Sequence, residues 1–214
     1  MDLNGDVEWY QLLNGGWLVK SIKQTIDGGY ACLTENGIIY RLDANGNTIW
    51  SEDLVLSATS GDLELSNSGN IIVSYNDLVS PTVIRGSVIS YSDGGQLNWS
   101  FSDVDGTIYS GLTILPNNDI VVGGRGFDGV DASRLVKLTG AGTIIWGYYF
   151  DAFPSSANYV NEEIVNVASG ANGSIYAVAR SSEQIYYMGM PTGLYSHTDN
   201  FLQFRTEEPR DGQN

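Results

Sequence analysis

The 214-residue sequence is poor in cysteine, histidine and basic residues, and each shortage excludes a kind of chemistry or partner. The single cysteine, Cys32, has no partner for an internal disulfide, and its apolar neighbours favour a core residue over a nucleophile. The single histidine, His197, cannot form a cluster of histidine ligands, so we expect no metal site. The 10 Lys and Arg residues against 25 Asp and Glu give a net charge of −15, which disfavours nucleic acid as a partner.

Long apolar runs are also missing from the sequence. None approaches the roughly 20 residues that cross a bilayer, so we expect no membrane insertion. The first residues, MDLNGD, are polar and lack the basic and apolar regions of a signal peptide. We therefore expect a soluble chain, either complete or a piece of a longer protein.

Glycine and tyrosine are abundant, whereas runs of helix-forming residues are rare. The chain holds 26 Gly and 13 Tyr, and Leu, Glu, Lys and Ala do not gather into helical stretches. This composition is typical of a β protein that is rich in turns.

Four related phrases recur along the chain, each with a glycine four residues before a tryptophan. They are DLNGDVEW, LDANGNTIW, YSDGGQLNW and LTGAGTIIW, with the pairs Gly5 and Trp9, Gly46 and Trp50, Gly95 and Trp99, and Gly142 and Trp146. The tryptophans at positions 9, 50, 99 and 146 follow one another at 41, 49 and 47 residues. Repeats of about 40–50 residues are typical of β-propellers or helical arrays.

The residues between the tryptophans favour strands over helices. Asn36-Gly37 and Asn45-Gly46 stand between apolar runs and predict tight hairpin turns. Each unit divides into four strand-like runs: 17–24, 30–34, 38–42 and 48–50; 63–65, 71–73, 83–91 and 97–99; 112–115, 120–122, 135–138 and 144–146; and 164–168, 175–178, 185–188 and 201–204. In the last unit Phe204 is predicted to replace the tryptophan, and 159–168 is the one segment for which a helix is an alternative.

Sheets of four short strands become stable when they stack face to face around an axis, because stacking buries their apolar faces. A tryptophan on the last strand can cover the neighbouring sheet and bury about 150–250 Å². Its indole N–H needs an acceptor, which a backbone carbonyl in the adjacent turn could supply. We therefore assign the recurring Gly and Trp residues a structural role.

The phrases LDANGNTIW and LTGAGTIIW resemble the tryptophan-docking repeat of the quinoprotein-like (PQQ-type) β-propellers. The resemblance extends over most of residues 2–204 and implies an all-β propeller of about four four-stranded antiparallel blades. It predicts one domain over residues 1–204 and a polar tail at 205–214. The quinoprotein motif places an Asp four residues before the Gly, whereas Asp43 here stands three residues before Gly46.

The resemblance does not extend to the catalytic parts of a quinoprotein dehydrogenase. Such enzymes are similar to one another in having a calcium site and a carboxylate base, and often a pair of neighbouring cysteines. This chain has no cysteine pair, so we expect no dehydrogenase activity, no catalytic residues and no cofactor.

Residues 2–9 have the pattern of a last strand without the three strands that should come before it. This strand could return to complete the final blade and close a small ring. Alternatively, the ring is completed by flanking sequence or by self-association with another copy. The prediction that 201–204 already forms a fourth strand favours the second possibility.

Aromatic residues outside the repeat are the weak candidates for a binding site. They are Tyr148, Tyr149, Phe153, Tyr186, Tyr187 and Tyr195. Aromatic side chains among Asn, Asp and Gly on loops suit protein or sugar recognition, although they could also fill the joins between blades. We expect a non-enzymatic binding or structural module outside a cell or on a virus particle, contacting protein or glycan through loop ends. The alternative is a carbohydrate-active enzyme with acidic residues at the central funnel.

Overall fold

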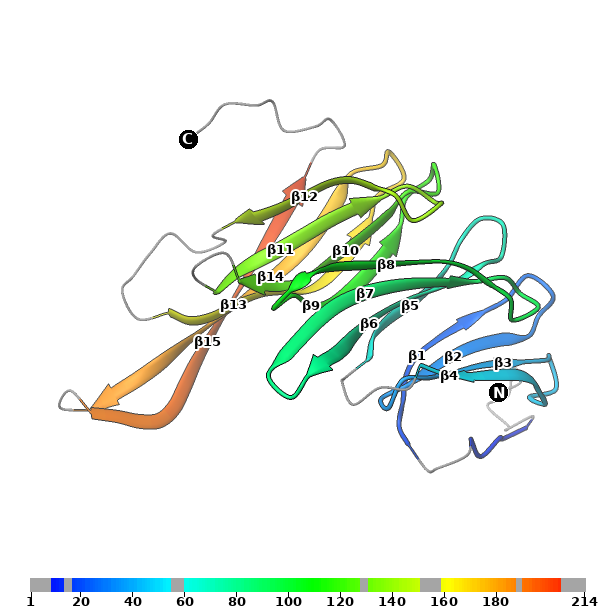
Figure 1. Ribbon diagram of the computed structural model, residues 1–214, viewed down its shortest axis with the longest axis horizontal. Coiled ribbons are helices and arrows are strands. Elements are labelled where there is room, and N and C mark those ends of the chain that lie inside the picture. The colour runs from blue at the N-terminus through cyan, green and yellow to red at the C-terminus, as the bar shows by residue number, and fades with distance from the viewer. Residues whose placement is uncertain are drawn as a thin grey trace, which may run out of the picture. The chain divides into compact units, whose positions relative to one another are not determined.

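The computed structural model describes residues 9–13, 17–54, 60–127, 131–150, 159–187 and 190–204. Within these ranges the chain forms β-strands and no helix, in three sheets of four strands and one of three (Figure 1). The all-β prediction is confirmed, and residues 159–168 belong to a strand rather than to the alternative helix. The chain divides into two compact units, Met1–Tyr109 and Ser110–Asn214.

The first unit contains two sheets whose strands follow the order of the sequence. The first sheet consists of β1 (Val19–Gln24), β2 (Tyr30–Thr34), β3 (Ile38–Leu42) and β4 (Thr48–Asp53), and the second of β5 (Ser60–Leu65), β6 (Ile71–Ser80), β7 (Val83–Tyr91) and β8 (Leu97–Asp105). Side chains of both sheets form one buried cluster: Ala31, Leu33, Ile39, Leu63, Ile71, Val73, Ile89 and Tyr91. Trp50 is partly buried and packs against this cluster.

The second unit repeats the plan, with one strand fewer. Its sheets are β9 (Ile108–Ile114), whose first residues precede the boundary between the units, β10 (Ile120–Phe127), β11 (Asp131–Leu138) and β12 (Ile144–Phe150), followed by β13 (Tyr159–Ser169), β14 (Ile175–Tyr187) and β15 (Met190–Phe204). The core joins Leu115, Val121 and Leu135 to Ile164, Val167, Ile175 and Ala177. Trp146 packs against this core, as Trp50 does in the first unit.

The turn between the first two strands of every sheet has the same backbone conformation. The fourth of the five residues between the strands has a positive φ in all four sheets: 84° at Gly28, 82° at Gly69, 68° at Asn118 and 80° at Gly173. Glycine adopts this left-handed conformation without steric cost, and asparagine tolerates it better than most residues. The Gly, Asn and Asp residues of the repeat therefore set the strand connections.

The fourth sheet corrects two predictions. Residues 199–204 are part of the long strand β15, so 201–204 is not a separate fourth strand. Phe204 pairs with Ile175 in the way that Leu42 pairs with Tyr30, which makes Phe204 the end of a third strand and not the counterpart of a tryptophan. Asp199 resembles a turn residue in sequence, but here it lies opposite Arg180 and forms an ion pair of 2.8 Å across the ladder.

Candidate functional site

Two of the recurring tryptophans lie against the glycine turn of the next sheet along the chain. The Trp50 Nε1 donates a hydrogen bond of 2.8 Å to the backbone carbonyl of Asp93, in the turn that precedes β8. A Cβ added to Gly95 in that turn would lie 3.1 Å from Trp50 Cδ2, and one added to Gly46 would lie 2.5 Å from Trp9 Cε3. The glycines therefore leave room for the indole rings as well as permitting the turn.

For the other four residues of the repeat, the structure gives less detail. Gly5 lies outside the described residues, and Gly142 has a φ of 80° that matches Gly46 and Gly95. Trp99 is partly buried on β8, and Trp146 packs on the core of the second unit.

Substitution of Gly95 by alanine should cost more stability than the same change at Gly69. Both glycines have a φ near +82°, but a Cβ on Gly69 would meet no atom within 4 Å, whereas one on Gly95 would crowd Trp50. We expect about 1–2 kcal/mol for Gly69→Ala, from backbone strain alone. Gly95→Ala should cost about 1 kcal/mol more than that. Urea unfolding followed by tryptophan fluorescence measures the free energy of unfolding of both variants. Equal losses of stability would contradict the contact between Trp50 and Gly95.

Arg41 is a buried cation that joins the two sheets of the first unit. Its side chain is 1% exposed and forms ion pairs with Asp27 at 2.7 Å and with Asp93 at 2.6 Å. It also donates a hydrogen bond to the carbonyl of Leu42. Asp27 lies in the first turn of the same sheet and Asp93 in the last turn of the second sheet, so Arg41 holds the Trp50 acceptor in place.

The Asp27 carboxyl carries a strong hydrogen-bond network. The Thr25 hydroxyl, the Arg41 guanidinium and the Gly29 N–H all donate to it, and they hold its pKa well below the usual value. The folded chain therefore binds fewer protons at this site than the unfolded chain once the pH falls below about 4. Stability that is fully present at neutral pH should be lost progressively as the pH falls below that value.

The urea midpoints of the wild type and of two variants at pH 7, 4 and 3 test this pH dependence. Asp27→Asn should be less stable than the wild type at pH 7 and should lose less of its stability between pH 4 and 3. The control Glu52→Gln removes an exposed carboxyl outside the network. If the three proteins lost stability in parallel on acidification, Asp27 would not be the source of the acid sensitivity.

The second unit contains a pocket of about 440 Å³ at the ends of its two sheets. Its lining residues come from the β9–β10 turn, from β11 and from the β13–β14 turn: Leu115, Pro116, Asn117, Lys137, Ala171, Asn172 and Gly173. Asn117 and Asn172 occupy the same position in their turns. Each Oδ1 accepts a hydrogen bond of 3.1 Å from the backbone N–H two residues later, at Asp119 and Ser174.

The only charged side chain that lines this pocket is Lys137, which is already neutralised by a neighbour. Its Nζ lies 2.8 Å from Asp119 Oδ2, and both side chains are largely buried, at 11% and 14% exposed. The Asn117 Nδ2 donates to the same oxygen at 2.8 Å. The pocket thus offers an ammonium group and two side-chain amides over apolar Leu115 and Pro116, which suits a small polar ligand without net charge.

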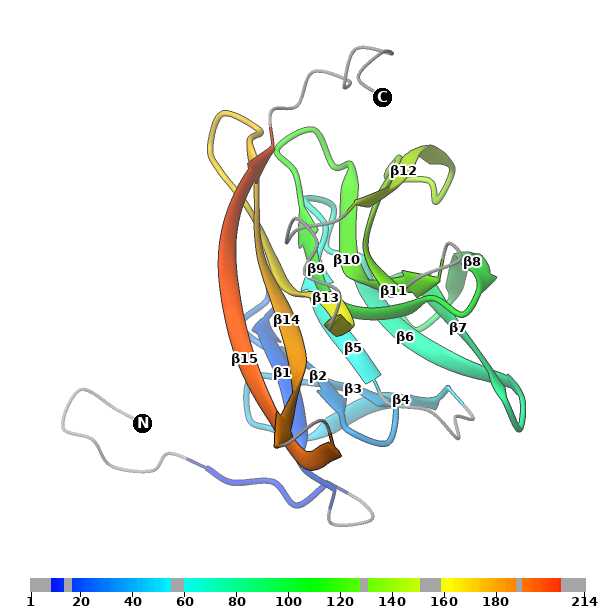
Figure 2. The same ribbon diagram turned by 90° about the vertical axis from the view of Figure 1, so that its left-hand side faces the viewer.

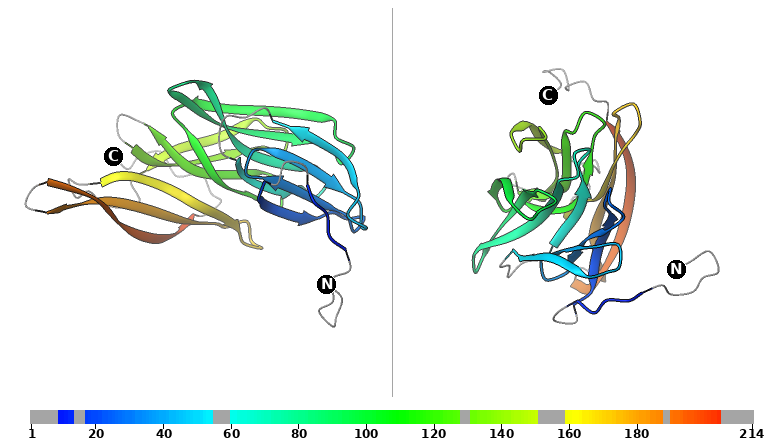
Figure 3. Two further views of the ribbon diagram at one scale, coloured as in Figure 1. Left: turned by 90° about the horizontal axis from the view of Figure 1, so that it is seen from below. Right: turned by 90° about the vertical axis from the view of Figure 1, so that its right-hand side faces the viewer.

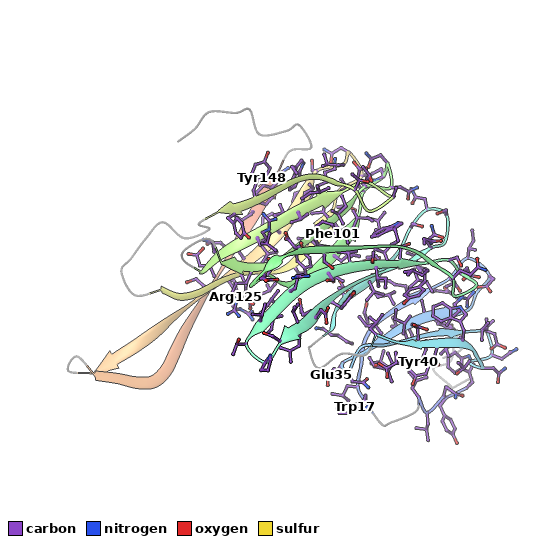
Figure 4. The ribbon with its side chains drawn as sticks, in the orientation of Figure 1. Trp17, Glu35, Tyr40, Phe101, Arg125 and Tyr148 are labelled. Carbon is purple, nitrogen blue, oxygen red and sulfur yellow. The ribbon has the colours of Figure 1, made fainter. Side chains whose placement is uncertain are left out.

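The structure does not bring the predicted aromatic residues into this pocket. Tyr148 lies on β12, 41% exposed, with its ring 5.4 Å from that of Trp146 (Figure 4). Tyr149 points to the other face of the strand, where the Arg134 guanidinium lies 4.3 Å from its ring centre. Phe153 lies outside the described residues.

Tyr186, Tyr187 and Tyr195 lie in the β14–β15 hairpin. These two strands extend past the end of β13, whose Tyr159 pairs with Glu183, so this part of the hairpin is two strands wide (Figure 3). Tyr187 pairs with Met190, and Tyr195 pairs with Gln184. The predicted binding residues are therefore spread over separate elements.

The residues that line the pocket were missed by the sequence reasoning, although one signal was present. Asn117 and Asn172 occupy the position in their turns that Asp27 occupies in the first sheet, where Asp27 binds Arg41. Lys137 stands opposite Trp146, as Arg41 stands opposite Trp50. A comparison of equivalent repeat positions would have placed a cation next to the turn in both sheets.

The chain is similar to solved structures of low sequence identity. One is a protein of unknown function from Bacteroides caccae, with a TM-score of 0.55 and 11% identity over 88% of this chain and 64% of that chain. The β-propeller domain of Myceliophteria thermophila Cps50 (Swd1) gives 0.51 and 17%, over 75% and 50%. Streptogramin B lyase gives 0.50 and 18%, over 84% and 53%.

These likenesses, together with the sheets, show that the chain has a β-propeller fold. It spans between a half and two thirds of the length of these three structures. No protein-family model and no curated protein matches the sequence, so the resemblance to PQQ-type repeats is not confirmed as a family relationship. No helix in the described ranges has the length and apolar character needed to cross a membrane.

Proposed function

We propose that this chain is a non-enzymatic binding module that holds a neutral, hydroxyl-rich part of a glycan in the pocket of the second unit. The observation that carries the proposal is the position of Asn117, Asn172 and Lys137 on one 440 Å³ pocket. A volume of this order accommodates a small ligand. Side-chain amides both donate and accept hydrogen bonds, as sugar hydroxyls require.

The charge of the chain supports a neutral ligand over an acidic one. The net charge of −15 repels polyanions, and Asp119 compensates Lys137. Pro116 and Ala171 are exposed and give the pocket apolar surface against which the carbon face of a sugar ring can pack.

The carbohydrate-active alternative is less well supported by this pocket. Glycoside hydrolysis uses two carboxyl groups on either side of the scissile bond. The residues that line the pocket include no carboxylate, and the neighbouring Asp119 is engaged by Lys137 and Asn117. Binding is therefore the function that the pocket supports best.

The proposal includes display outside a cell or on a virus particle. Its support is the composition, with 26 Gly, 13 Tyr and charged residues at only 16%. Immunogold labelling of intact cells or particles of the source with an antibody against the chain tests this part; labelling confined to the cell interior would overturn it.

The ligand test starts from a glycan array and continues with titration calorimetry of the best glycan. Asn172→Asp keeps the Oδ1 acceptor for the Ser174 N–H and removes the amide donor, so affinity should fall about tenfold. Asn45→Asp adds the same charge on an exposed turn of the first unit and should bind like the wild type. Equal weakening by both variants, no binding of any glycan, or release of shorter products from a polysaccharide would overturn the proposal.

A further inference from the structure

The sheet β13–β14–β15 is one strand short in the described part of the chain. In the other three sheets a fourth strand pairs with the third, and it carries the tryptophan of the repeat. Here β15, the third strand, is the last in its sheet and lies on the side of β14 away from β13 (Figure 2). In the other sheets the corresponding edge of the third strand pairs with a fourth strand.

The chain that follows β15 does not have the sequence of a fourth strand. In the first three sheets a glycine comes four residues after the third strand ends, as in Leu42 and Gly46, and the tryptophan follows four residues later. At the same distances from Phe204 the chain has Glu208 and Gly212, with Pro209 between them. Proline cannot donate a ladder hydrogen bond, and no tryptophan is present to cover a neighbouring sheet.

Residues 2–9 have the sequence that the fourth sheet lacks. They contain Gly5 and Trp9 at the repeat spacing. Trp9 lies against Gly46, and its ring is 5.4 Å from that of Tyr30, just as Trp50 lies against Gly95 and 6.0 Å from the ring of Tyr91. Trp9 therefore packs on the first sheet as Trp50, from the fourth strand of the first sheet, packs on the second. By this analogy Trp9 belongs to the fourth strand of a sheet that lies before β1–β4 in the ring.

We infer that residues 9–12 of one copy of this chain pair antiparallel with residues 200–203, at the end of β15, of a second copy. The register follows from the three complete sheets, where the tryptophan stands opposite the residue before the last of the third strand: Arg41 opposite Trp50, Ser90 opposite Trp99 and Lys137 opposite Trp146. Trp9 then stands opposite Gln203, and Gln11 stands opposite Phe201. Each copy donates one strand and accepts one, as in a symmetric dimer.

Exposed apolar side chains lie on both partners of this pairing. Phe201, 70% exposed on β15, would lie beside Gln11, and Tyr10, 83% exposed, would lie beside Leu202 on the other face of the sheet. Burial of such surface stabilises a strand pair in addition to the ladder hydrogen bonds. A second copy is favoured as donor because the chain spans only 50–64% of the length of the solved propellers, which a second copy would extend with sheets of the same kind.

Disulfide trapping between two single-cysteine variants tests the inference. Gln11→Cys and Phe201→Cys are prepared separately in a Cys32→Ala background, mixed and mildly oxidised. Cβ atoms of directly opposed strand residues lie about 4.5–5.5 Å apart, close enough for a disulfide after a small adjustment. We expect a linked species of twice the 23.2-kDa chain mass that contains both variants. The matched control pairs Leu12→Cys with Phe201→Cys, because position 12 faces the other side of the strand, and it should not link.

The double variant Gln11→Cys with Phe201→Cys in one chain distinguishes the donors. A link within one chain, at monomer mass, would overturn the second copy in favour of closure by the chain's own segment. No link in any combination, or equal linking of the Leu12→Cys control, would overturn the strand pairing itself. Light scattering of the unmodified protein should give twice the chain mass, and a monomer would contradict the dimer. Because the glycan pocket is in other elements, its titration is a separate result.

Discussion

Replacing Arg41 with alanine should lower the free energy of unfolding by about 3 kcal/mol. The change empties a buried volume between the two sheets of the first unit and leaves Asp27 and Asp93 without their shared cation. The loss is less than that of a fully buried ion pair, because the two carboxylates are half exposed and stay hydrated. Urea unfolding followed by tryptophan fluorescence gives the difference.

Two further variants separate volume from charge in this result. Arg41→Met fills most of the space and should recover part of the loss, since the half-exposed carboxylates can be solvated by water. Arg85→Ala removes an arginine from an exposed pair with Asp105 and should cost less than about 1 kcal/mol. If Arg41→Ala were no more costly than Arg85→Ala, the buried guanidinium would not join the sheets.

Replacing Trp50 with alanine should also cost about 3 kcal/mol. The indole packs on the core shared by the first two sheets, covers Gly95 and donates to the Asp93 carbonyl. Trp50→Phe keeps an aromatic ring but loses the indole N–H, and it should cost about 1–2 kcal/mol. Both values come from the same urea titration.

Trp17 is the matched control for this experiment. It precedes β1 and is 54% exposed, so Trp17→Ala should change stability by less than about 0.5 kcal/mol (Figure 4). Similar losses from Trp50→Ala and Trp17→Ala would show that the repeat tryptophan has no special place in the packing.

Much of the fold could be predicted from the sequence because the repeat marks it at several levels. The predictions match the strands Tyr30–Thr34, Ile38–Leu42 and Val83–Tyr91 to the residue. Glycine turns bound the first two on both sides, and Val83–Tyr91 lies between Pro81-Thr82 and the Gly94-Gly95 turn. The fourth strands are longer than predicted. In β4 the residues Ser51, Glu52 and Asp53 continue the ladder although they are polar, because they lie on an exposed edge where their side chains reach water.

The fourth sheet and the pocket could not be predicted, for two different physical reasons. Asp199 has the composition of a turn, and its pairing with Arg180 across the strand depends on residues 19 positions apart. Asn172 and Lys137 are turn and strand residues by local pattern, and they meet only when the two sheets of the second unit pack together. Local sequence carries no signal for the Arg180–Asp199 pair. For the pocket, the signal lies only in the comparison of equivalent repeat positions, such as Lys137 with Arg41.

The most direct test of the tryptophan docking is a double-mutant cycle of Trp50→Ala with Gly95→Ala. If the added methyl group crowds the indole, Gly95→Ala should cost about 1 kcal/mol less in the Trp50→Ala background than in the wild type. Its cost there should fall to that of Gly69→Ala, where only the backbone is strained. Additive losses, within about 0.5 kcal/mol, would show that Trp50 and Gly95 do not interact and would contradict the docking of one sheet's tryptophan on the next sheet's turn.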